Sequence, residues 1–304
     1  MTKISALIAL LFITTSSIAQ GTRQLFEFPF EGVTINGVLN LPETQNSKGI
    51  VLLVYGSGTT NAVAQEWYQD IRATFVKAGY GIYMWDKMGC GDSGGTFDIN
   101  QTVDNSALEV IAAINTLKEQ NIPGTERIGL YGGSRASWIN LIVINQYKDI
   151  AFWISVSGVD NKENFGYLLE QNLRIEGVPQ DSIDILVNEW KEGNRIQYTG
   201  GTYEEAVNAT QNLSKNAFLK RFNGGQTITK EAYYNYQDNH KGVKIDEITG
   251  LPIVVNNFET ILSNIRIPVL ALFGERDMNV DWKKTKSFYK NTLAKNTDLE
   301  IKTF

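Results

Sequence analysis

The chain alternates short apolar runs with helix-length segments over much of its length. Four runs, each nearly continuous in apolar residues, read GIVLLVYG, YGIYMWD, RIGLYGG and AFWISVSG. Such runs are typical of strands buried on both faces of a parallel sheet. Between two of them, residues 104–120 repeat apolar positions at helical spacing, which predicts a helix capped by Asp104. The alternation predicts a doubly wound, mostly parallel α/β sheet with its site at the carboxyl ends of the strands.

Two segments depart from this alternation. Near the N-terminus, LFEFPFEGVTINGVLNLP alternates apolar and polar residues, which predicts an antiparallel hairpin with one covered face. Residues 160–257, approximately, are polar and aromatic with helical patterns, so we expect an inserted helical cap there. The sheet pattern resumes with IPVLALFG, a helix over WKKTKSFYKNTLAK and a last strand at LEIKTF. Residues 20–304 are therefore expected to form one α/β domain that carries the cap.

Residues 1–19 have the order of a secretory signal peptide. One Lys precedes an apolar run at 4–13, and a Ser/Thr-rich stretch leads to Ser17-Ile18-Ala19 before Gln20. The apolar run is short against the ~20 residues that span a bilayer, so we expect no stable membrane insertion. The segment predicts cleavage after Ala19 and a secreted or periplasmic protein.

Composition narrows the classes of partner. The 28 basic and 33 acidic residues form no long run of either sign, which argues against nucleic acid. The sequence has no spaced His, Cys and carboxylate set for a metal and no nucleotide-binding glycine motif, so no metal or cofactor is expected. Cys90 is the only cysteine and no histidine accompanies it, which favours a small packed residue over a nucleophile.

Ser134 is the candidate nucleophile. The stretch IGLYGGSRAS places it among small residues where a strand gives way to a helix. A serine on so tight a turn projects its hydroxyl above the sheet, and the following helix N-terminus favours developing negative charge. A plain glycine turn is the alternative. Two further glycine-rich segments, YGSG and DKMGCGDSGG, follow neighbouring strands and favour the nucleophile.

Four motifs in one order make the chain resemble the α/β-hydrolase superfamily, nearest to bacterial secreted esterase-like members and serine aminopeptidases. They are the oxyanion segment at 55–58, D-x-R-G-x-G-x-S at 86–93, G-x-S-x-G at 132–136 and the acid segment G-x-x-D at 274–277. The resemblance implies Ser134 as nucleophile and Asp277 as acid. It also implies backbone N–H groups of Ser57 and Arg135 as the oxyanion hole. Two rival acids lie close to Asp277: Glu275 and Asp281.

Three positions differ from the superfamily pattern. Tyr55 stands where His is usual, which we expect to be tolerated because the oxyanion donors are backbone groups. Met88 replaces an Arg and removes a charge that often ties these loops together, and Ala136 replaces a Gly. We therefore expect an altered periphery around the site.

The resemblance also implies a histidine base on the loop after the last strand, and the sequence ends at that strand. The one histidine present, His240, precedes Asp277 in the predicted cap, and we interpret it as a solvated loop residue. We therefore expect a chain truncated before its histidine loop. Tyr233, Tyr234 and Tyr236, also in the predicted cap, either line a pocket under it or pack it against the core.

Three functions follow from these observations. The first is a serine hydrolase that cleaves a small-molecule carboxylic ester through an acyl-enzyme. The second is an aminopeptidase-type serine peptidase on short peptides, which needs a carboxylate pair in the cap to hold the substrate amine. The third is an inactive, truncated α/β-hydrolase that serves as a binding or remnant protein.

Overall fold

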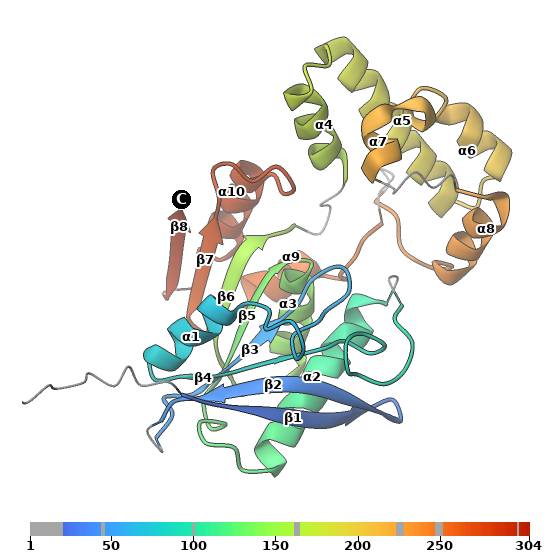
Figure 1. The fold of residues 1–304 in the computed structure, drawn as a ribbon. Coiled ribbons are helices and arrows are strands. Elements are labelled where there is room, and N and C mark those ends of the chain that lie inside the picture. The colour runs from blue at the N-terminus through green and yellow to red at the C-terminus, as the bar shows by residue number, and fades with distance from the viewer. Residues whose placement is uncertain are drawn as a thin grey trace, which may run out of the picture.

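The computed structural model describes residues 21–43, 46–98, 101–160, 165–222, 228–246, 252–296 and 298–304. The predicted signal segment at 1–19 lies outside these residues. An eight-stranded sheet forms the centre, in the order β1-β2-β4-β3-β5-β6-β7-β8 (Figure 1). Its strands are β1 Thr22–Phe30, β2 Val33–Leu41, β3 Ile50–Val54, β4 Gly81–Trp85, β5 Ile128–Ser134, β6 Ile150–Gly158, β7 Val269–Phe273 and β8 Leu299–Thr303.

The strand directions match the predicted α/β architecture. β1 and β2 form an antiparallel hairpin, and β2 pairs antiparallel with β4. The strands from β3 to β8 pair parallel with one another. The predicted doubly wound, mostly parallel sheet with an N-terminal hairpin is confirmed.

Helices cover both faces of the sheet. The helices are α1 Gln69–Lys77, α2 Val103–Glu119, α3 Ala136–Gln146, α4 Phe165–Ile175, α5 Gln180–Tyr198, α6 Tyr203–Ala209, α7 Ala217–Phe222, α8 Lys230–Asn239, α9 Phe258–Ser263 and α10 Trp282–Thr292. Leu52 of β3 joins the large core cluster with residues of α2, α3, α9 and α10. Its neighbours Val51 and Leu53 join a smaller cluster against α1, because successive strand residues point to opposite faces. Burial on both faces explains the continuous apolar runs.

The cap of α2 differs from the prediction. Thr102 is extended, with φ −64° and ψ 156°, and its hydroxyl accepts from the Asn105 N–H at 3.1 Å. Asp104 lies inside the first turn, where its charge suits the helix dipole. The prediction of Asp104 as the N-cap residue was wrong. An N-cap residue keeps a non-helical backbone while its side chain accepts from a free backbone N–H, and Thr102 meets both conditions.

Helices α4 to α8 gather beyond the end of the sheet toward which the parallel strands point (Figure 1). They follow β6 in the chain and precede α9, within the segment predicted to be a cap. A separate apolar cluster joins α4, α5 and α7, and its buried members are Leu169, Leu173, Ile183, Leu186 and Leu213. The cap therefore has a small core of its own.

The predicted tyrosine cluster packs within the cap. The buried Tyr233 donates its hydroxyl to the Gly201 carbonyl at 3.0 Å, and Tyr236 shares a 2.7 Å hydrogen bond with Tyr198 of α5. Tyr236 also lines a surface cavity of about 450 Å³ between the ends of α5 and α8. The tyrosines thus join cap helices to one another. The two predicted roles were a pocket lining under the cap and packing of the cap against the core. Among the described helices, none is long and apolar enough to cross a membrane.

Candidate active site

Ser134 sits on a strained turn at the end of β5. It is exposed, and its φ of +53° lies in the left-handed region, which is costly for a residue with a Cβ. A Cβ added to Gly132 would lie 2.7 Å from the Ala136 Cβ, and one added to Gly133 would lie 3.0 Å from the Val156 carbonyl oxygen. The small residues around Ser134 are therefore required by packing, as the motif predicted.

The loop after β3 lies against this turn. A Cβ on Gly56 would be 2.9 Å from the Gly133 carbonyl oxygen and 3.5 Å from the Arg135 backbone nitrogen. Ser57, the next residue, is exposed, and Gly58 has a φ of +84°. The structure therefore brings the two predicted oxyanion residues, Ser57 and Arg135, to neighbouring loops at one edge of the sheet.

Lys87, in the loop after β4, forms hydrogen bonds to the loop after β3. Its Nζ donates to the carbonyl oxygens of Gly56 at 2.6 Å and Gly58 at 2.9 Å, and lies 5.0 Å from the Tyr55 ring centroid. Its backbone N–H donates to the Thr60 hydroxyl at 2.6 Å. Burial lowers the pKa of the Lys87 amine to about 8. Lys87 thus contacts the loop through both side chain and backbone.

Lys87 was not among the predicted site residues. Met88 lacks the charge that often ties such loops together, and that charge lies one residue earlier, on Lys87. Met88 is half-buried beside Gly95, where an added Cβ would meet its Cγ at 2.6 Å. The available signal was a lysine directly after the aspartate that follows a buried strand, since a lysine there lies at the carboxyl edge of the sheet.

Asp86 is the first residue of the glycine-rich loop that follows β4, and its buried carboxylate binds backbone N–H groups of this loop and of the loop after β3. The residue is fully buried, and its carboxylate accepts from the Ala62 N–H and, at 3.2 Å, from the Asp92 N–H. Burial raises the pKa of this carboxyl. Gly91 has a φ of +49°, and a Cβ there would lie 2.1 Å from Asp86 Oδ2. The buried Cys90 beside it is a packed residue, as predicted.

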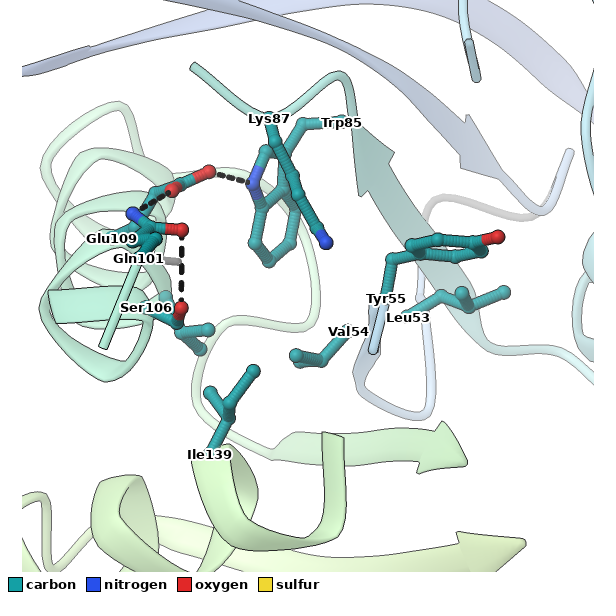
Figure 2. Close-up of a pocket in the computed structure, with 10 residues that line it drawn as sticks. Leu53, Val54, Tyr55, Trp85, Lys87, Gln101, Ser106, Glu109 and Ile139 are labelled. Carbon is teal, nitrogen blue, oxygen red and sulfur yellow. Dashed lines mark hydrogen bonds between the residues drawn. The ribbon is translucent and has the colours of Figure 1, made fainter. Parts of the chain in front are cut away.

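A polar group of Trp85, Gln101, Ser106 and Glu109 lies beside Lys87 and the end of β3 (Figure 2). Glu109 of α2 accepts from Trp85 Nε1 at 2.6 Å and from Gln101 Nε2 at 3.3 Å. The Arg135 guanidinium donates to the Gln101 carbonyl and, at 3.2 Å, to the Ser106 hydroxyl. Burial raises the pKa of Glu109 and lowers that of Arg135. Lys87 points into the small space between these groups, whose volume is about 10 Å³.

Asp277 lies in the loop that follows β7. One of its carboxylate oxygens accepts from the backbone N–H groups of Asn279 at 2.8 Å and Val280 at 3.0 Å, which orients the side chain. The Tyr167 hydroxyl of α4 donates to the Asp277 carbonyl at 3.2 Å. The candidate acid therefore lies at the same edge of the sheet as Ser134, in contact with the cap.

The two rival acids have other surroundings. Asp281 is the N-cap of α10, where its carboxylate accepts from the Lys284 N–H at 3.1 Å. Glu275 is exposed, and its backbone N–H donates to the Phe304 carbonyl at 2.7 Å. This last bond places the end of β8 beside the acid loop.

His240 is held within the cap. It ends α8, its Nδ1 lies 2.8 Å from the Tyr236 carbonyl oxygen, and its ring stacks on that of Tyr236 with centroids 4.0 Å apart. The expected solvated loop residue was wrong in this respect, because the ring is half-buried. The contacts of the His240 ring are with Tyr236 and Tyr198 inside the cap, and no hydrogen bond joins it to Ser134 among the described residues.

A surface pocket of about 380 Å³ adjoins Lys87. It is lined by Glu31, Lys87, Met88, Thr96, Phe97, Asp98, Gln101, Thr102, Asn105 and Asn239. Its walls come from the β1–β2 turn, the glycine-rich loop after β4, the start of α2 and the end of α8. Within the described part of the chain, no group of three or more His, Cys, Asp and Glu side chains could hold a metal ion.

A family model of the X-Pro dipeptidyl-peptidase (S15 family) matches residues 31–302. The chain belongs to this S15 family. The match begins at the turn between β1 and β2 and includes the strands from β2 onward and the cap, so it covers both candidate site residues, Ser134 and Asp277. None of the curated proteins compared with the chain matches it significantly.

Solved structures similar to this S15-family chain include three hydrolases. The Pyrococcus furiosus esterase Pf2001 is 17% identical, with a TM-score of 0.56 over 93% of this chain and 81% of that one. Mycobacterium smegmatis proline iminopeptidase is 15% identical, with a TM-score of 0.54 over 92% and 90%. Pyrococcus horikoshii acylaminoacyl peptidase is 12% identical, with a TM-score of 0.53 over 95% and 37%. The chain has the α/β-hydrolase fold and is a hydrolase of that type.

The left-handed backbone at Ser134 makes a stability prediction. We expect Ser134→Gly to be about 1 kcal/mol more stable than Ser134→Ala, because only glycine adopts a positive φ without strain. Urea unfolding of both variants measures the difference. At Ser287, exposed in the middle of α10, the order should reverse, because alanine favours a helix over glycine by about 1 kcal/mol. The same order at both positions would contradict the strained turn.

Proposed function

We propose that this protein is a serine hydrolase that cleaves a carboxylic ester through an acyl-enzyme. The observation that carries the proposal is Ser134, exposed on a left-handed turn at the end of β5 with the Gly56 loop packed against it. The Ser134 hydroxyl attacks the substrate carbonyl, and the backbone N–H groups of Ser57 and Arg135 hold the oxyanion that forms. Water then cleaves the acyl-enzyme and releases the acid.

The proton of Ser134 requires a base. In the proposed mechanism a histidine takes this proton and returns it to the leaving alcohol, and Asp277 orients the histidine. Phe304 donates its N–H to the Phe273 carbonyl at 3.0 Å, so β8 leaves the sheet beside the Asp277 loop. A base that completes this mechanism must reach both Ser134 and the Asp277 loop at this edge of the sheet.

A peptidase is the second candidate, supported by the family description and by the pocket beside Lys87. Glu31 and Asp98 line that pocket, and two carboxylates suit the amine of a peptide N-terminus. Glu31 lies in the turn between β1 and β2, and Asp98 lies in the loop between β4 and α2. The predicted carboxylate pair was instead expected in the cap. A peptide bond would be cleaved by the same attack of Ser134.

Covalent labelling tests the nucleophile. A fluorophosphonate probe should label the full natural chain at Ser134, and Ser134→Ala should abolish labelling because the attacking oxygen is gone. Intact-mass and peptide mass spectrometry read out the result. Ser57→Ala is the matched control and should keep labelling, because Ser57 is proposed to act through its backbone. A folded wild-type protein that stays unlabelled, or a labelled Ser134→Ala variant, would overturn the proposal.

A pair of substitutions distinguishes the candidate acid, Asp277, from its rival Asp281. Asp277→Asn should lower kcat by on the order of 10⁴-fold, because an amide cannot orient and stabilise the charged base. Asp281→Asn should leave kcat near the wild-type value and lower the free energy of unfolding by at most about 1 kcal/mol, because Asn also caps helices. Steady-state kinetics and urea unfolding distinguish them. If Asp281→Asn loses activity and Asp277→Asn does not, the acid is misassigned.

Paired substrates separate the two candidate activities. We expect a higher kcat/KM for a short-chain acyl ester than for an X-Pro dipeptidyl amide, because an ester has the better leaving group. The substitution Asp98→Asn should leave ester turnover unchanged. A preference for the amide that is lost in Asp98→Asn would instead assign the peptidase activity and place the substrate amine in the pocket beside Lys87.

A further inference from the structure

Lys87 contacts the peptide unit that carries one proposed oxyanion donor. The Gly56 carbonyl and the Ser57 N–H belong to the same peptide group, and none of the described peptide bonds is cis. In a trans peptide the C=O and N–H point in opposite directions. Because the Lys87 amine donates to the Gly56 oxygen at 2.6 Å, the Ser57 N–H points away from Lys87. A second bond, to the Gly58 oxygen at 2.9 Å, holds the other side of Ser57.

The contact also changes the strength of the donor. A charged amine on a carbonyl oxygen polarises the peptide and makes its N–H a stronger donor, since hydrogen bonds in series reinforce one another in a low dielectric. The series here runs from the Lys87 ammonium through the Gly56 carbonyl and the Ser57 N–H to the oxyanion. A positive charge at one end suits the negative charge that forms at the other.

Other charged and titratable groups face Lys87. Glu109 of α2 favours its charged form, and Arg135, which carries the second proposed donor, opposes it. Cys90 and Tyr55 also lie near it, and Glu31 and Asp98 line the surface pocket that Lys87 shares. The Arg135 guanidinium donates in turn to the Gln101 carbonyl and the Ser106 hydroxyl, and Gln101 and Ser106 line the same small space as Lys87.

We propose that Lys87 is a positioning residue of the oxyanion hole, which aims and polarises the Ser57 N–H through the Gly56 carbonyl. The inference rests on the proposed function, because it presumes attack by Ser134. In this role Lys87 acts on the reaction through the Gly56–Ser57 peptide group and not by contact with the reacting atoms. Its effect is confined to the transition state, in which the oxyanion exists.

The amine makes this effect depend on pH. The pKa of Lys87 is lowered to about 8 by burial, so the charge is present below pH 8 and is lost above it. The turnover number should therefore decline as pH rises through about 8, while KM changes little. Removing the negative charge of Glu109 should lower the pKa of Lys87 further and move the decline to lower pH.

Kinetics on four variants of the full natural chain test the inference. Lys87→Met should lower kcat of ester hydrolysis about 10- to 100-fold with little change in KM, because the donor remains but is no longer aimed or polarised. Lys87→Arg should recover much of kcat and lose the decline near pH 8, because arginine stays charged. Glu109→Gln should shift the decline to lower pH. Lys118→Met, at an exposed ion pair on α2, is the matched control and should match the wild type.

The outcomes separate the inference from the function. If Ser134→Ala keeps activity, the proposed function fails and the inference fails with it. If Ser134→Ala is inactive while Lys87→Met keeps the wild-type kcat and pH profile, only the inference fails. Should Lys87→Met not fold, judged by its thermal unfolding, Lys87→Arg decides alone. A decline that stays near pH 8 in Lys87→Arg would overturn the role of Lys87.

Discussion

The candidate site depends on how closely two backbone segments approach each other. A methyl group on Gly56 would lie 2.9 Å from the Gly133 carbonyl oxygen, closer than carbon and oxygen normally approach. Glycine at 56 lets the loop after β3 lie against the turn at Ser134, and small residues at 132, 133 and 136 let that turn form. With any larger residue at these positions, the backbone nitrogens of Ser57 and Arg135 would move apart. A catalytic function for the loops therefore requires this packing.

Three charged side chains lie beside these two backbone segments. Lys87, Glu109 and Arg135 lie under the loops, in a part of the molecule where water is largely excluded and electrostatic interactions are strong. Glu109 favours the charged form of Lys87 and Arg135 opposes it, so the charges of the three side chains are coupled. In many enzymes, dipoles and charges held in place before the reaction supply a large part of transition-state stabilisation. The buried group has the right sign and place for this role.

The acid loop links the sheet to the cap. Asp277 is oriented by its own loop, through the N–H groups of Asn279 and Val280, so its carboxylate does not depend on the cap for its direction. Tyr167 of α4 nevertheless donates to the Asp277 carbonyl. The cap, which has its own apolar cluster, therefore contacts the core at a residue next to the proposed chemistry. This contact gives the cap a direct route to influence the shape of the site.

Local patterns predicted much of the fold and part of the site. Apolar runs flanked by glycines predicted the parallel strands, and small residues around Ser134 predicted its tight turn, because strand periodicity and turn sterics depend on residues adjacent in the chain. Local patterns also predicted the wrong N-cap residue for α2, Asp104, and a solvated His240. The first error arose because Thr102 and Asp104 both suit a helix cap and the backbone selects between them; the second arose because the His240 ring packs on Tyr236.

Partners distant in the sequence could be recognised only in the structure. Lys87 reaches Gly56 across 31 residues, and Tyr167 reaches the Asp277 carbonyl across 110. No periodicity records such pairs, because they depend on which loops the crossovers of the sheet bring together. The sequence by itself determined the sheet, the strained serine and the order of the motifs. Only the tertiary packing shows that the half-buried Lys87 holds the loop after β3, that Asp281 caps a helix and that the His240 ring stacks on Tyr236.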